Sequence, residues 1–281
     1  MVTDAELRAG LEAAGFGALV EDVIAKTRSE VWITATRSDV LALGQSRIGG
    51  APDLPRGTPW PRQRWTHAET AAWPDWARSE IAPAIAEGVV IDAGTHLALA
   101  LPFVAQLDCA ELAPFQDVLP RVGHLWLFAD QQTTLGEIGH HWYQASACLY
   151  AVDAELVPTP FPPVPEKLPG FVLAFALGRV LPGANDLDLR GDDWYRYEAA
   201  VEPFKQPEPA HALLPVSIAG ANSESPPPGY TGILRVDSDY TNYTIDEGIN
   251  WGDASWITFA LPPAALAASR FDELRAFRFD G

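Results

Sequence analysis

The backbone of this chain is most constrained between residues 48 and 61, where the sequence reads IGGAPDLPRGTPWP. Glycine permits backbone conformations closed to other residues, and proline fixes φ and removes a backbone donor. A segment rich in both residues is typical of a loop. Trp60 lies between two prolines, which hold its large ring in place at low entropic cost. We therefore expect a rigid loop, the Gly-Pro segment (residues 48–61), that packs against another part of the protein.

The composition predicts a globular protein with a substantial core. The chain has 281 residues, of which 48% are hydrophobic, enough for one large domain or two small ones. No apolar run approaches the roughly 20 residues that span a bilayer, and the N-terminus lacks the pattern of a signal peptide. Cys109 and Cys148 form no CxxC motif, so we expect buried thiols and no thiolate-rich zinc site. These features favour a cytoplasmic protein.

The charge argues against nucleic acid as a partner. The chain carries a formal net charge of −18, and such a surface repels a phosphate backbone. The same acidity could attract a basic protein partner, or it could serve only to keep the protein in solution.

Hydrophobic periodicity predicts an α+β fold with mostly antiparallel or mixed β-sheets and short peripheral helices. Residues 4–27 have the pattern of amphipathic N-terminal helices, interrupted at Gly15 and Gly17. The strands are expected at residues 30–40, 101–107, 123–129, 142–152, 232–237 and 254–260, and residues 171–177 form a short apolar run. Short helices are expected after Asp108 and at Pro262-Pro263, and residues 182–195 are expected to form an acidic loop.

The chain contains a faint internal echo. Residues 123–130 resemble residues 232–239, and residues 103–112 resemble residues 257–266, with the two pairs in opposite order. The echo indicates either a pseudo-twofold repeat or the chance likeness of short strands.

Two further segments, FVAQLD at residues 103–108 and WGDA at residues 251–254, accompany the Gly-Pro segment. Together, and in this order, they resemble the YwqG-like family of bacterial proteins of unknown function. The resemblance implies one domain over residues 1–281. A proline-rich connector at residues 158–169 separates two possible halves, 1–157 and 170–281. Residues 62–100 are an insertion relative to the family pattern. His211 and the leucines after it resemble a family element. In that element a glycine follows the leucines, whereas this chain has Pro215 at that position.

An acidic cluster is the strongest metal-like signal. Asp237 and Asp239 lie two residues apart, so in a strand their carboxylates would share a face and repel, and a divalent cation would relieve that repulsion. The following positions do not match an EF-hand loop. The alternative is that these acidic side chains cap backbone amides in turns.

The remaining ligand-binding candidates each have a structural alternative. They are Trp60, Gln106, Asp108, His211, Trp251 and Asp253. Gln106 and Asp108 share a strand face and could orient a ligand, or Gln106 could tie the Gly-Pro segment to the sheet. Asp253 could accept backbone N–H groups, and Trp251 could belong to the core or to the floor of a pocket.

No catalytic residues are predicted, because the sequence lacks HExxH, a Gly-x-Ser-x-Gly elbow and a Walker loop. Two functions remain. The first is a non-catalytic binding or interaction module, for example an immunity-type or regulatory protein that masks a basic protein. The second is a small-ligand or divalent-cation-dependent enzyme that uses the acidic cluster above an aromatic floor. No other cofactor is expected.

Overall fold

The computed structural model describes residues 3–71, 73, 75, 79, 97–130, 145–162, 167–205, 211–215, 226–239, 248–251 and 254–280. The strands are β1 (Arg28–Arg37), β2 (Arg47–Ile48), β3 (Asp53–Pro55), β4 (Arg62–Trp65), β5 (Leu97–Ala100), β6 (Phe103–Asp108), β7 (His124–Ala129), β8 (Ser146–Ala151), β9 (Leu156–Pro158), β10 (Phe171–Val180), β11 (His211–Leu213), β12 (Thr231–Asp237), β13 (Ala254–Leu261) and β14 (Arg275–Asp280). The α-helices are α1 (Asp4–Ala13), α2 (Val20–Lys26), α3 (His67–Ala71), α5 (Cys109–Leu112), α7 (Asp192–Val201) and α8 (Pro263–Ala267). The 3-10 helices are η1 (Gly17–Leu19), η2 (Ala184–Leu187), η3 (Glu202–Phe204) and η4 (Phe271–Glu273).

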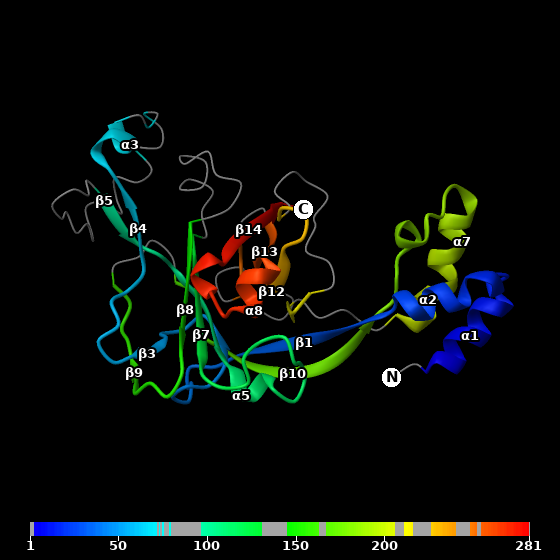
Figure 1. The fold of residues 1–281 in the computed structure, drawn as a ribbon, viewed down its shortest axis with the longest axis horizontal. Coiled ribbons are helices and arrows are strands. Elements are labelled where there is room, and N and C mark those ends of the chain that lie inside the picture. The colour runs from blue at the N-terminus through cyan, green and yellow to red at the C-terminus, as the bar shows by residue number, and fades with distance from the viewer. Residues whose placement is uncertain are drawn as a thin grey trace.

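A ten-stranded sheet organises the fold, and its neighbouring strands are all antiparallel. Its order is β14-β13-β12-β11-β1-β10-β2-β6-β7-β8. The sheet curls so that its edge strands approach each other, and the backbone N–H of Ala276 on β14 donates to Ser146 Oγ on β8 at 3.1 Å (Figure 1). The α+β architecture predicted from periodicity is confirmed.

The strand order repeats about the central pair. The first half of the repeat consists, in chain order, of β1, β2, β6, β7 and β8, and the second half of β10, β11, β12, β13 and β14. Each half forms one side of the sheet, except that the first strands are exchanged: β1 lies next to β11, and β10 lies next to β2. The Gly49 N–H donates to Val104 O at 2.8 Å, and the Leu214 N–H donates to Ile233 O at 2.9 Å. These matching bonds align the two halves, and each half has a register shift at the corresponding place on β6 or β12. The sheet is therefore a pseudo-twofold repeat.

The segments matched by the sequence echo do not correspond in this repeat. Residues 123–130 belong to β7, next to one edge strand, whereas residues 232–239 belong to β12, third from the other edge. The echo matched glycine, aliphatic and aspartate positions, which short buried strands share, so it did not detect the true alignment. The sheet also takes strands from both sides of the proline-rich connector, and the division at that connector stays a prediction.

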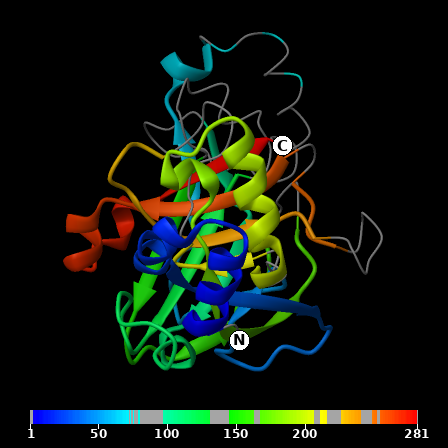
Figure 2. The ribbon, with the colours of Figure 1, turned by 90° about the vertical axis from the view of Figure 1, so that its right-hand side faces the viewer.

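Helices α1, α2 and α7 gather at one end of the β1–β10 ribbon, away from the rest of the sheet (Figures 1 and 2). Thr3 begins α1 with a capping box in which Glu6 is the partner, and Gly15, at φ +86°, follows its end. The predicted interruption of the N-terminal helices is confirmed. Leu7 and Leu11 of α1 pack against Tyr197 of α7 in a small core of their own.

The expected acidic loop at residues 182–195 is wrong in part, because η2 lies within it and α7 begins at Asp192. Acidic side chains in a first turn complement the helix dipole, so Asp192 and Asp193 mark a helix start rather than a loop. Tyr197 and Val201 supply the buried stripe of this helix. Every helix in the described part of the chain is too short or too polar to span a bilayer.

Candidate functional site

The loop before and after β2 is fastened by a buried arginine. Arg47 donates to the carbonyls of Ala42, Gln45 and Ala51 at 2.5, 3.2 and 3.0 Å. Its guanidinium also lies 2.5 Å from the carboxylate of Asp53, and the two side chains are only 3% and 4% exposed. Burial lowers the pKa of Arg47, while the charge of Asp53 opposes that shift. One side chain thus closes residues 42–53 into a fixed loop.

Gln106 ties this loop to the sheet. Its Oε1 accepts the backbone N–H of Asp53 at 2.8 Å, and its Nε2 donates to Gln45 O at 3.1 Å. Trp126 on β7 donates from Nε1 to Asp53 O at 2.9 Å and to Gln106 Oε1 at 3.0 Å. The side chains of Arg47, Asp53, Gln106 and Trp126, the buried polar network, are therefore mutually satisfied.

The rest of the Gly-Pro segment packs on the same face of the sheet. Leu54 and Trp60 contact the cluster that contains Phe103 and Phe128, and Trp60 donates from Nε1 to Leu101 O at 2.8 Å. Gly49 has φ +61°, and a Cβ atom there would lie 2.0 Å from Pro169 O. A glycine is required at this position, as the density of glycine and proline predicts.

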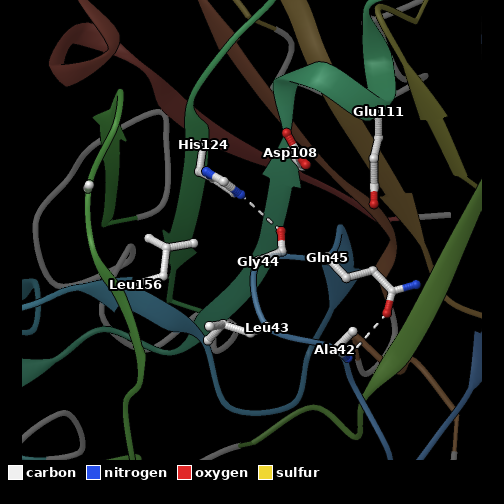
Figure 3. Close-up of a pocket in the computed structure, with 9 residues that line it drawn as sticks. Ala42, Leu43, Gly44, Gln45, Asp108, Glu111, His124 and Leu156 are labelled. Atoms are coloured by element: carbon white, nitrogen blue, oxygen red, sulfur yellow. Dashed lines mark hydrogen bonds between the residues drawn. The ribbon is translucent and has the colours of Figure 1, made fainter.

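An open groove of about 630 Å³ lies beside this fixed loop (Figure 3). It is lined by Ala42, Leu43, Gly44, Gln45, Asp108, Glu111, His124, Ala154 and Leu156. One wall is the loop before β2, and the other carries Asp108 at the end of β6, Glu111 on α5 and His124 at the start of β7 (Figure 3). The groove thus combines two carboxylates, an imidazole and aliphatic side chains.

Each polar side chain of the groove is held in place by the backbone. Asp108 Oδ1 accepts the Ala110 N–H at 2.9 Å and begins α5, as predicted, and Glu111 Oε2 accepts the Ser46 N–H at 3.2 Å. His124 Nε2 donates to Gly44 O at 3.0 Å, since a carbonyl can only accept, and the ring stacks on Trp126. The charged groups line the groove in fixed positions.

Four other predicted residues gather on the second half of the sheet, away from the groove. His211 is buried on β11, opposite Val236 of β12, and Asp237 ends that strand. Asp239 pairs through its backbone with Ile249. Trp251 is 1% exposed in the main core and donates from Nε1 to Val236 O at 2.8 Å. Asp253 lies outside the described residues.

His211 has a structural counterpart in the first half. Its Nδ1 accepts the Asp237 N–H at 3.1 Å, just as Ser46 Oγ accepts the Asp108 N–H at 2.8 Å. Burial lowers the pKa of His211 to about 4, while Asp239, 3.9 Å from Nε2, opposes the shift. The imidazole is therefore neutral near neutral pH, and its proton lies on Nε2 because Nδ1 accepts.

The described residues contain no group of three His, Cys, Asp or Glu side chains placed to share a metal ion. Asp237 pairs with Arg235 at 3.1 Å, from carboxylate Oδ1 to guanidinium Nε. The divalent-cation site proposed for Asp237 and Asp239 stays a prediction. Cys109 and Cys148 are buried free thiols, and burial raises the pKa of both, that of Cys109 to about 12.

Sequence reasoning missed Arg47, Asp53, Glu111 and His124 as members of the site. Asp53 lies within the Gly-Pro segment and Arg47 directly precedes it, so charged residues beside a rigid loop were the available signal. Glu111 and His124 carried no such signal, because they meet the loop only through the pairing of β2, β6 and β7.

Residues 46–277 match a family model described as a domain of unknown function, DUF1963. The match covers most of the chain, from β2 to β14, and the chain therefore belongs to this family. No curated protein matches the chain.

Proposed function

We propose that this protein is a non-catalytic binding module of the bacterial cytoplasm whose groove receives a basic segment of a protein partner. The order of its three motifs supports placing it with the YwqG-like proteins. The observation that carries the proposal is the groove itself, in which Asp108 and Glu111 line a wall that faces the loop of Leu43.

Charge complementarity supports a basic occupant. A lysine or arginine side chain would meet two carboxylates at the groove wall, and the net charge of −18 would attract a cationic partner over a longer range. Both carboxylates accept one backbone N–H each, which leaves further acceptor positions for a ligand.

Aliphatic side chains extend the groove into an amphipathic surface. Leu43 is 60% exposed, and Val40 on the same loop is 82% exposed. Leu43 faces Leu156 across the groove (Figure 3). An occupant that carries an apolar residue next to a basic one would cover these side chains and contact the carboxylates together.

The rigid loop favours binding by reducing the ordering cost. The buried polar network holds residues 42–53 before any partner arrives, and preorganised surfaces lose less entropy on association.

The test compares two double variants with equal changes in net charge. D108N/E111Q removes both charges from the groove, while Asn still caps α5 and Gln can still accept the Ser46 N–H. E12Q/D22N removes two exposed charges from α1 and α2, at the far end of the β1–β10 ribbon (Figure 1). Fluorescence anisotropy with a labelled peptide of alternating Lys and Leu residues measures binding.

We expect the groove variant to bind the peptide about tenfold more weakly than the wild type, with E12Q/D22N nearly unchanged. Equal weakening in both variants would mean that only the overall charge matters, and the groove would lose its role. The proposal would also be overturned if both variants bound the peptide with the wild-type affinity, or if the wild type did not bind it at low salt.

A further inference from the structure

The pseudo-twofold repeat places two rows of side chains in equivalent positions on the sheet. In the first half, the row across β2, β6 and β7 reads Arg47, Gln106 and Trp126. In the second half, the row across β11, β12 and β13 reads Ala212, Arg235 and Thr258. The alignment rests on the matching hydrogen bonds of Gly49 and Leu214.

One residue, Asp53, is hydrogen-bonded to every member of the first row. Asp53 accepts from Arg47 and Gln106 through its carboxylate, and its main chain bonds Gln106 and Trp126. The Gly-Pro segment thus places the carboxylate of Asp53 against this face of the sheet.

Among the residues that the structure describes, the donors of the second row have no acceptor that corresponds to Asp53. Thr258 is 0% exposed, and its hydroxyl has no hydrogen-bond partner in the part of the chain that the structure describes. The Trp256 indole N–H is also buried without a partner among the described residues. A buried donor left without an acceptor is costly, so such groups point to a missing ligand or water.

We propose that this row is a second binding site, which takes the carboxylate of a small organic acid at the place that corresponds to Asp53 in the first half. The donors are the Arg235 guanidinium, the Thr258 hydroxyl and the Trp256 indole N–H. Trp256 and Thr258 are two residues apart on β13 and share a face, and Arg235 lies directly opposite Thr258.

Arg235 has the capacity to bind the ligand. Its Nε pairs with Asp237 Oδ1 at 3.1 Å, and its two terminal nitrogens carry four further N–H groups that can bind a second carboxylate. Its side chain is 14% exposed and that of Asp237 is 24% exposed, so this end of the row reaches solvent. Ala212 stands where the first row has Arg47, and its small side chain contributes no competing charge.

The test titrates the full-length protein with sodium succinate or sodium acetate, with sodium chloride at equal ionic strength as the reference. Two-dimensional NMR follows the indole N–H of Trp256, identified by its loss in W256F. The key variant is T258V, which keeps the side-chain shape and removes the hydroxyl. T34V is the matched control, because Thr34 is an exposed threonine on β1 of the same sheet.

We expect the carboxylates, and not chloride, to shift the Trp256 signal in a saturable manner. T258V should bind about tenfold more weakly, R235Q should lose binding, and T34V should behave as the wild type. T258V should also unfold at the wild-type temperature or above it, because its hydroxyl has no partner to lose.

Three results would overturn the proposal: a Trp256 signal that follows ionic strength alone, full carboxylate binding by T258V, or strong destabilisation by T258V, which would mean that the hydroxyl is already bonded within the protein. D108N/E111Q should leave carboxylate binding unchanged, so this site and the groove succeed or fail separately.

Discussion

The substitution Arg47→Met tests whether the buried polar network holds the Gly-Pro segment on the sheet. Methionine keeps the aliphatic stem but removes the donors to three carbonyls and to Asp53, whose side chain is 4% exposed. Removal of one partner from a buried ion pair leaves an uncompensated charge and costs about 3–5 kcal/mol. The melting temperature should fall by roughly 10 °C for a chain of this size.

Urea unfolding followed by the fluorescence of the ten tryptophans measures this change in the free energy of unfolding. The double variant R47M/D53N should recover part of the lost stability, because it also removes the unpaired negative charge of Asp53. As a control, R56M breaks an ion pair with Glu155 whose side chains are 65% and 66% exposed, and it should change stability little. A loss below about 1 kcal/mol for R47M, or simple additivity in the double variant, would refute the reasoning.

Two further predictions follow from backbone geometry and from burial. Gly49→Ala should destabilise the protein by about 2–4 kcal/mol, because a Cβ would lie 2.0 Å from Pro169 O at φ +61°, whereas Gly57→Ala, at φ +82° with open space, should cost about 1 kcal/mol in the same urea assay. His211 has its pKa lowered from 6.5 to about 4, so the unfolded chain binds a proton in that range before the folded protein does. Stability from the neutral imidazole is complete above pH 6.5 and falls as the pH decreases toward 4, by about 3 kcal/mol more in the wild type than in H211Q. Parallel pH dependence in the two proteins would contradict the burial argument.

Much of the local structure could be predicted because its causes lie within a few residues. The β-branched and aromatic run at residues 30–40 corresponds to β1, and the apolar run at 123–129 corresponds to β7. Asp108 begins α5, and Pro262 precedes α8, as expected from capping preferences. In α7, the acidic first turn was mistaken for a loop, since charge density alone does not distinguish a solvated turn from a helix start.

The two halves could not be aligned from the sequence. Their equivalence lies in register and hydrogen bonds, such as those of Gly49 and Leu214, and these contacts tolerate wide changes in side chain. Ser46 and His211 show this most clearly, because a hydroxyl and an imidazole accept the equivalent N–H of Asp108 and Asp237.

The sequence by itself determined the rigid Gly-Pro segment, the α+β character and the net negative charge, because backbone preference, periodicity and charge belong to the chain before it folds. Only the tertiary structure decided what the segment contacts. Asp53 meets Gln106 across 53 residues of sequence, and Glu111 meets Ser46 across 65. Such contacts depend on which strands pair and in which register, and that choice is made by the burial of the whole sheet.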